Sequence, residues 1–238
     1  MKSIEVVLLG SQLIKIVQEQ TNVYTRYGMK ISVLLADDHE VIREGVKSML
    51  EGSEVNVVAE AATGNQAIEQ AVKLHPDVVL LDIRMPETDG LEALERITDR
   101  SPRTKVVIFS SFDNPTYIAR AVALGAAGYV LKGAPKDEIL TAINRAHTGI
   151  PPETDSILGR VKNTMARRRP TYDEDIPLTN REVQVLRHVA LGLSNREIGR
   201  SLDISIETVK EHMQNILRKL EAGDRTEAAV WAVKKGLV

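Results

Sequence analysis

The chain of 238 residues contains no cysteine, no long apolar run and almost no net charge. Without cysteine there is no disulfide framework, no thiolate metal site and no cysteine nucleophile. A membrane-spanning helix needs about 18 or more consecutive apolar residues, and no such run occurs. The run at 6–10 is too short for a signal peptide, and Glu5 lies where a basic flank belongs. We therefore expect a cytoplasmic protein with no membrane partner.

The formal net charge of −2 conceals an uneven distribution along the chain. Residues 29–150 contain 13 Lys and Arg against 18 Asp and Glu, whereas residues 177–238 contain 10 against 8. An acidic body followed by a mildly basic tail indicates two domains with different tasks. Apolar residues make up 43% of the chain and charged residues 27%, which is an ordinary globular composition rather than a disordered one.

Five short apolar runs rich in Val and Ile alternate with longer stretches of helical periodicity. Nearly continuous apolar runs are typical of parallel strands that are buried on both faces. The runs predict strands at 31–36, 55–60, 77–81, 105–109 and 127–131. The stretches between them predict helices at 41–50, 65–74, 90–97, 115–124 and 136–147. This alternation predicts an α/β fold, an open, doubly wound parallel sheet with helices on both faces.

The double proline at 151–152 ends this unit, and only helical signals follow residue 178. We divide the chain into an extension at 1–29, an α/β domain at 30–148, a linker at 149–176 and an all-α domain at 177–238. Apolar residues at 157, 158, 161 and 165 favour a short amphipathic helix in the linker, and a solvated linker is an equal alternative. The extension fits neither domain. One hypothesis is that Met29 is the true start and that the extension is a gene-model artefact.

Three carboxylates follow two strands of the predicted sheet. Strand one ends at Asp37 and Asp38, and strand three ends at Asp82. Right-handed crossovers place strand three beside strand one, so the three acids converge at the carboxyl edge. Carboxylates this close repel one another unless a cation lies among them. A hard divalent ion with oxygen ligands fits, and Mg²⁺ fits best.

Two further polar residues follow the remaining strands at the same edge. Ser110 follows strand four and Lys132 follows strand five. A hydroxyl, an ammonium and a metal around one carboxylate form a phosphoryl-binding pocket. We therefore expect Asp82 to attack phosphorus as a nucleophile and to become an aspartyl phosphate. Each residue alone has an ordinary structural explanation, but five of them at one sheet edge indicate a site.

Four segments carry a resemblance to a known family: LLADDHEVIREGV (34–46), VVLLDIRMPETDGLEAL (78–94), VVIFSSFD (106–113) and GAAGYVLKGA (125–134). Residues 30–147 resemble the receiver domain of two-component response regulators. The resemblance implies the flavodoxin-like strand order 2-1-3-4-5 and a sensor histidine kinase as partner. It implies that Asp82 is the phosphoacceptor and that Mg²⁺ is held by Asp38, Asp82 and the Arg84 carbonyl, with Asp37 supporting. Ser110 and Tyr129 resemble the family's switch pair.

The tail contains three pairs with the spacing of a helix N-terminal capping box: Thr179 with Glu182, Ser194 with Glu197, and Asp224 with Glu227. The third uses Asp where the motif prefers Ser or Thr. We expect four short helices, with 194–202 as the supporting helix and 205–219 as the reading helix of a helix-turn-helix. A Lys can read guanine in the major groove, and a Gln can read adenine.

The segment 192–220 resembles the four-helix LuxR-type DNA-binding domain, and residues 30–238 together resemble the NarL/FixJ subfamily of regulators. The resemblance implies that Lys210 contacts DNA and that Glu211 and Gln214 set the sequence preference. Further candidates, mainly for backbone phosphates, are Arg196, Arg200, Thr208, Asn215 and Arg218. Three alternatives stay open. The polar stripe of the reading helix is only a solvated surface, or Arg218 pairs with Glu211 or Glu221 along its helix instead of contacting phosphate. Trp231 has either a core-packing role or a role in a dimer contact.

We therefore expect a DNA-binding transcriptional response regulator that phosphorylation of Asp82 switches. Its basic excess of two makes a single module a weak DNA binder, so we expect a homodimer on paired half-sites of double-stranded DNA. One alternative is a phosphohydrolase, but such enzymes usually carry an acid two residues after the nucleophile, where this chain has Arg84. Another alternative is a regulator that works without phosphate. We do not expect an enzyme.

Overall fold

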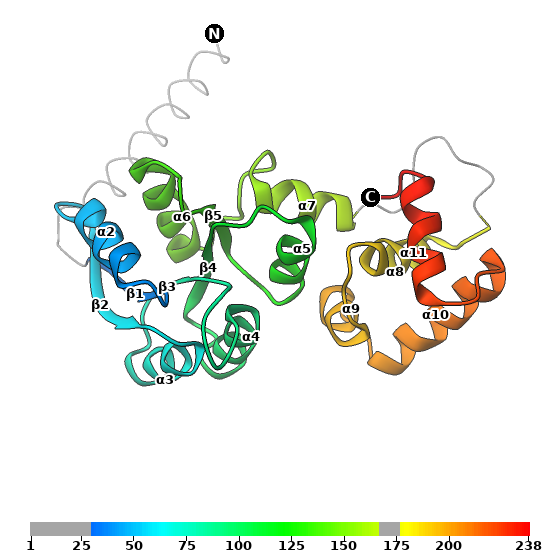
Figure 1. The fold of residues 1–238 in the computed structure, drawn as a ribbon, viewed down its shortest axis with the longest axis horizontal. Coiled ribbons are helices and arrows are strands. Elements are labelled where there is room, and N and C mark those ends of the chain that lie inside the picture. The colour runs from blue at the N-terminus through cyan, green and yellow to red at the C-terminus, as the bar shows by residue number, and fades with distance from the viewer. Residues whose placement is uncertain (1–29, 167–176) are drawn as a thin grey trace, which may run out of the picture.

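The computed structural model describes residues 30–166 and 177–238 (Figure 1). The first part contains a parallel sheet in the order β2-β1-β3-β4-β5, which confirms the predicted fold. Its strands are β1 (Ile31–Ala36), β2 (Val55–Ala61), β3 (Val78–Leu81), β4 (Lys105–Ser110) and β5 (Gly128–Leu131). Its helices are α2 (Glu40–Leu50), α3 (Gly64–Leu74), α4 (Gly90–Arg100), α5 (Pro115–Ala123) and α6 (Lys136–Thr148).

Both faces of the sheet are buried, because successive side chains of each strand enter different cores. In β1, Leu34 belongs to one apolar cluster, while Val33 and Leu35 belong to another. Helices α3, α4 and α5 cover the first face, and α2 and α6 cover the second (Figure 1). The near-continuous apolar runs of the sequence therefore reflect helices on both sides.

The linker contains helix α7 (Ile157–Ala166), which packs against both parts of the molecule. Leu158 lies in the core of the α/β domain, and Met165 lies in the core of the C-terminal helices. The alternative of a solvated linker is wrong for this helix, because both side chains are almost fully buried. Residues 167–176 of the linker and the extension at 1–29 lie outside the described residues.

The C-terminal part contains the four predicted helices, α8 (Asn180–Ala190), α9 (Asn195–Leu202), α10 (Ile206–Leu220) and α11 (Arg225–Lys234). Capping boxes open α8 and α9, as predicted. The third pair forms only half of a box. Asp224 accepts from the Glu227 amide, but the Glu227 carboxylate accepts from Gly223 instead. Trp231 packs half-buried against this core, in agreement with the packing alternative.

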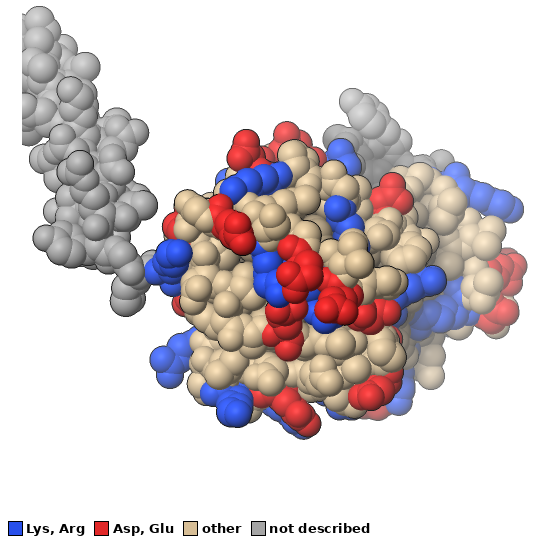
Figure 2. Space-filling view, turned by 60° about the vertical axis from the view of Figure 1, so that its left-hand side comes forward, with Lys and Arg blue, Asp and Glu red and all other residues tan. Residues whose placement is uncertain are grey.

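Charged side chains are distributed over the surface without a broad basic face on the side in view. Figure 2 shows Asp and Glu gathered near the middle of that side, with Lys and Arg among them. Ion pairs Arg43–Glu60 and Lys47–Glu60 join α2 to β2. Among the described residues, no helix has both the length and the apolar character needed to cross a membrane.

Candidate functional site

The sheet brings the predicted acids, the lysine and the serine to one edge. Ala36 of β1 pairs with Leu81 of β3, so the residues that follow them are neighbours. The Asp82 amide donates to the Ala36 carbonyl at 2.8 Å. On the other side, the Lys132 amide donates to the Ser110 carbonyl at 2.9 Å. The register of four parallel strands thus produces the convergence that the sequence predicted.

Lys132 lies between two buried carboxylates at this edge. Its Nζ is 2.8 Å from Asp82 Oδ2 and 2.6 Å from Asp37 Oδ2. Burial raises the pKa of Asp82, and it is opposed by the hydrogen bond and the charge of Lys132. Burial lowers the pKa of Lys132, but the two carboxylates outweigh burial and leave that pKa raised. Asp82 is therefore an acid held against a cation in a partly desolvated cleft.

Asp37, Asp38 and His39 have the arrangement of a cation site. One possible ligand atom from each lies within 4.8 Å of the others. Asp37 Oδ2 is the one buried side-chain oxygen of the described residues that has no hydrogen bond, although it has the ion pair with Lys132. A buried acceptor beside a second carboxylate fits a hard divalent cation. Sequence reasoning missed His39, whose Nδ1 is 2.7 Å from Asp38 Oδ1. Asp82 is not part of this group.

Ser110 and Tyr129, the predicted switch pair, lie together beside the carboxylates. Ser110 is fully buried, and its Oγ accepts from the Phe112 amide at 3.2 Å. The Tyr129 hydroxyl donates to the Phe112 carbonyl. Burial raises the pKa of Tyr129 to about 12 despite a hydrogen bond with Ser110, so the phenol is neutral at physiological pH.

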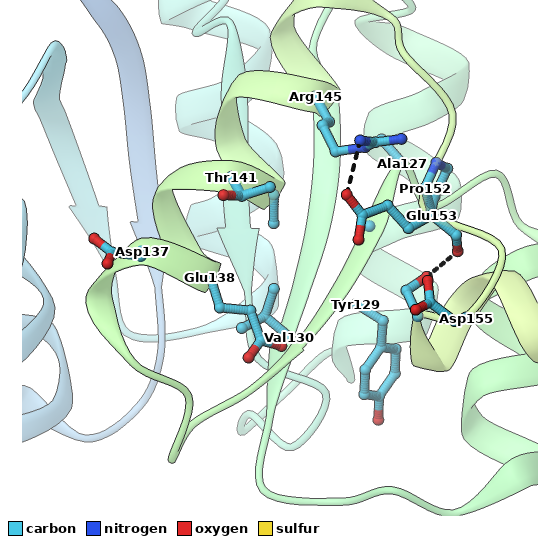
Figure 3. A pocket seen from close by; sticks show the side chains of 13 residues that line it. Ala127, Tyr129, Val130, Asp137, Glu138, Thr141, Arg145, Pro152, Glu153 and Asp155 are labelled. Atoms are coloured by element: carbon cyan, nitrogen blue, oxygen red, sulfur yellow. Dashed lines mark hydrogen bonds and ion pairs between the residues drawn. The ribbon is translucent and has the colours of Figure 1, made fainter.

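Tyr129 also lines a pocket of about 480 Å³ on the outer side of β5. Figure 3 shows β5, helix α6 and residues 152–155 around this pocket, with Arg145 paired to Glu153 at one end. The Tyr129 hydroxyl points away from Arg145 (Figure 3). The ring of Tyr129 therefore connects the carboxyl edge of the sheet with a surface that α6 and the linker share.

Gly90, at the start of α4, fixes the backbone at Asp82. A Cβ added to Gly90 would lie 1.8 Å from the Asp82 carbonyl oxygen. The Gly90 amide donates to the Ile83 carbonyl at 2.7 Å, and Asp89 caps the helix. Only glycine allows this close approach, so α4 is packed directly against the segment that carries Asp82. The sequence motif contained this glycine without revealing its contact.

Arg84 lies two residues after Asp82, and its side chain covers an aromatic ring. Its guanidinium carbon is 4.4 Å from the centroid of Phe112. A pocket of about 470 Å³ is lined by Asp38, Arg84 and residues of α4 and α5. Arg84 thus occupies the sequence position, two residues after Asp82, at which a phosphohydrolase usually carries its general acid.

The predicted reading helix α10 presents to solvent a polar stripe made of Glu207, Lys210, Glu211, Gln214 and Arg218. Val209, Met213 and Ile216 are buried against the other helices, whereas Lys210 and Gln214 are exposed. Lys210 pairs with Glu207 at 2.8 Å along the helix. Glu211 is exposed and Thr208 is half-buried, with its hydroxyl 2.9 Å from that of Ser205. The stripe is accessible to a partner over its whole length.

The three arginines among the predicted phosphate contacts all have protein partners. Arg218 donates to Asn215 at 3.0 Å rather than pairing with Glu211 or Glu221. Arg196 and Arg200 of α9 form ion pairs with acidic residues of α4, in the other domain. No sequence pattern predicts this contact between the domains.

A parallel sheet with paired acids and a lysine at its carboxyl edge, joined to a four-helix helix-turn-helix unit, defines a response regulator. Residues 33–144 match the response regulator receiver domain, and residues 176–232 match the bacterial regulatory proteins of the luxR family. The chain belongs to the two-component response regulators with a LuxR-type DNA-binding domain. We refer to its two parts below as the receiver domain and the DNA-binding domain.

Relatives of nearly the same length support this assignment. The transcriptional regulatory protein LnrK of Bacillus subtilis (strain 168) is 38% identical over 218 residues, which cover 87% of this chain and 98% of LnrK. The response regulator protein VraR of Staphylococcus saprophyticus is 38% identical over 211 residues, 88% of this chain and all of VraR. These names favour the regulator over the phosphohydrolase alternative.

Solved structures share the fold. The crystal structure of a LuxR-family two-component response regulator from Aurantimonas has a TM-score of 0.53 at 27% identity and covers 58% of this chain and 99% of that one. RcsB of Salmonella typhimurium has a TM-score of 0.53 at 24% identity over 86% of this chain and 98% of RcsB, a likeness of fold alone.

Proposed function

We propose that the protein is a transcription regulator that a sensor histidine kinase switches by phosphorylating Asp82. The observation that supports this most strongly is the position of Lys132, within 2.8 Å of Asp82 and 2.6 Å of Asp37. A cation held there neutralises charge that develops on a transferred phosphoryl group. Family membership supports a kinase as the source of that group.

The phosphoryl transfer is a simple displacement. A carboxylate oxygen of Asp82 attacks the phosphorus of a phosphohistidine, an O–P bond forms and the N–P bond breaks. The departing imidazole nitrogen keeps the electron pair and takes a proton from solvent. Lys132 neutralises one phosphoryl oxygen, and the Ser110 hydroxyl donates to another. Tyr129 lies beside Ser110, and its ring moves together with that hydroxyl. The conformational change thereby reaches the surface at β5.

The acidic group at the carboxyl edge fits Mg²⁺. Asp38, Asp82 and the Arg84 carbonyl would hold the ion, with Asp37 and His39 supporting. When bound, Mg²⁺ would supply positive charge to the phosphoryl oxygens and reduce repulsion between the acids.

The second half of the function is DNA binding. Lys210, Glu211 and Gln214 on the exposed stripe of α10 would contact base edges in the major groove. The expected contacts to backbone phosphates are Arg196, Arg200, Thr208, Asn215 and Arg218. Phosphorylation would promote pairing of two chains, and two linked modules bind paired half-sites more tightly than one.

Substitution of the acceptor tests the proposal. Asp82→Asn should abolish incorporation of radioactive phosphate from a histidine kinase or from acetyl phosphate. The matched control is Asp113→Asn, which changes an exposed acid in the loop after β4 and should leave labelling intact. Labelling of Asp82→Asn at the wild-type rate would refute the assignment of the acceptor.

A further inference from the structure

Two acidic residues of the receiver domain hold both arginines of α9. Arg200 lies 2.8 Å from Asp99 and 3.3 Å from Glu95, and Arg196 lies 3.0 Å from Glu95. The Glu95 and Arg200 side chains are largely buried, at 18% and 27% exposure. Carboxylates in the middle and near the end of α4 thus present to α9 the negative oxygen atoms that a DNA backbone phosphate would present.

A second contact fixes the orientation of α9. Arg120 of α5 lies 2.6 Å from Glu197. Glu197 is only 10% exposed, and it also closes the capping box of α9 by accepting from the Ser194 amide at 2.7 Å. Burial raises the pKa of the Glu197 carboxyl, but the hydrogen bonds from Arg120 and Ser194 outweigh it and leave that pKa lowered. The charged form of Glu197 is therefore tied to the receiver domain.

The contact between the domains is packed as well as charged. Ala119 and Ala123 of α5 are buried in the same cluster as the core of the DNA-binding domain. The polar stripe of α10 is not part of this contact, since Lys210 and Gln214 remain exposed. The receiver domain therefore occupies the two arginines of the supporting helix α9. It leaves the polar stripe of the reading helix α10 exposed.

We propose that Glu95 and Asp99 compete with the DNA backbone for Arg196 and Arg200. This inference rests on the proposed function, because it takes the α9 arginines as phosphate contacts. An arginine that is paired with α4 cannot also neutralise a phosphate, so receiver docking and full DNA engagement exclude each other. The interaction surface on α4 is thus an internal substitute for the phosphate backbone.

The position of Arg120 connects this contact to the phosphorylation site. Arg120 lines the same pocket as Asp38 and Arg84. The receiver face that holds α9 therefore adjoins a pocket lined by Asp38 and by Ile83 and Arg84, the two residues that follow Asp82. A change in charge or packing at this pocket is adjacent to the residue that fixes α9.

Neutralisation of the two acids tests the competition. The double variant Glu95→Gln, Asp99→Asn in the full, unphosphorylated chain should bind a fluorescent mixed-sequence DNA duplex about fivefold more tightly than its control. The matched control is Glu69→Gln, Glu92→Gln, which removes two receiver charges, one of them on α4, without touching α9. Equal affinities of the two double variants would overturn the proposal.

Hydrogen exchange supplies a second measurement that does not depend on affinity. Addition of duplex DNA to the wild-type chain should increase amide exchange in residues 90–100, because α9 leaves α4 when its arginines pass to phosphate. Unchanged protection of 90–100 in a saturated DNA complex would overturn the competition while leaving DNA binding established. A wild-type chain that binds no duplex at low salt would instead refute the proposed DNA binding itself.

Discussion

Lys132 and Asp82 form an ion pair across the cleft at the carboxyl edge of the sheet, with 2.8 Å between Nζ and Oδ2. This pair joins the end of β5 to the end of β3, and it places a positive charge against the Asp82 carboxylate. Burial raises the pKa of Asp82, and Lys132 is the principal group that opposes the rise. The pKa of Asp82 therefore depends on a residue 50 positions away in the sequence.

Replacement of Lys132 by Met should reduce phosphorylation strongly while the fold is retained. The methionine fills similar space but leaves the charge on the phosphoryl oxygens without its partner. We expect the rate of labelling from acetyl phosphate to fall roughly 100-fold. Lys136→Met, at the exposed start of α6, serves as the control and should label normally. Normal labelling of Lys132→Met would remove Lys132 from the site.

Replacement of Gly90 by Ala should destabilise the receiver domain. The new Cβ would lie 1.8 Å from the Asp82 carbonyl oxygen, so α4 or the segment after β3 must move. We expect the free energy of unfolding to decrease by about 2 kcal/mol or more. Thermal unfolding followed by circular dichroism measures this.

Gly45 offers the contrasting case for the same substitution. It lies inside α2, and nothing lies within 4 Å of a Cβ added to it. Gly45→Ala should therefore leave stability unchanged or raise it by up to about 1 kcal/mol. If Gly90→Ala unfolds at the same temperature as Gly45→Ala, the close packing of α4 against Asp82 is not important for stability.

The DNA-binding domain should lose stability in mild acid because of His188. This imidazole is buried, with Nδ1 2.7 Å from the Gln184 carbonyl and Nε2 2.9 Å from the Ser201 hydroxyl. Since a carbonyl only accepts, Nδ1 carries the hydrogen and Nε2 accepts from Ser201. Burial lowers the pKa of His188 below its ordinary value of 6.5. The unfolded chain thus binds more protons below pH 6.5.

The sign of this effect follows from linkage. The contribution of neutral His188 to the free energy of unfolding is fully present above pH 6.5, the pKa of this imidazole in the unfolded chain. It decreases as the pH falls through 6.5 toward the lower pKa of His188 in the folded domain. We expect a loss of about 1 kcal/mol on going one pH unit below 6.5. Urea unfolding monitored by the fluorescence of Trp231, which packs in this domain, measures the loss. An identical loss in His188→Gln would assign the acid sensitivity to other groups.

Replacement of Lys210 by Ala should weaken specific DNA binding and leave phosphorylation of Asp82 unchanged. Lys210 is exposed on α10 and has only Glu207 as a partner within the described part of the chain. Loss of one base contact costs about 1–3 kcal/mol, or roughly 5- to 150-fold in affinity. Lys234→Ala, which removes one exposed charge from α11, is the control. An unaltered footprint would exclude Lys210 from the DNA interface.

The sheet and the acidic edge were predictable because they depend on local patterns and on a topology rule. Each strand is an apolar run, and right-handed crossovers alone place Asp82 beside Asp37. The capping boxes at Thr179 and Ser194 were predictable because both partners lie within one helical turn. Helix α7 was harder to predict from the sequence, because its burial depends on contacts with the cores of both domains.

The contacts between the domains were not predictable from the sequence. Arg200 and Asp99 are 101 residues apart, and neither has a neighbour that reveals the pairing. The role of His39 was missed because its spacing beside Asp37 and Asp38 is also that of an ordinary helix start. At Asp224 the spacing of a capping box was present, but the Glu227 side chain instead bonds the amide of Gly223.

The most direct test of the account compares DNA affinity before and after phosphorylation in the wild-type chain and in Asp82→Asn. A genomic fragment recovered by selection with the phosphorylated protein serves as the ligand. We predict that phosphorylation tightens wild-type binding by at least about tenfold, as pairing of two modules provides, and leaves Asp82→Asn unchanged. Equal wild-type affinities in the two states, or the same gain in Asp82→Asn, would contradict the proposal that Asp82 controls DNA binding.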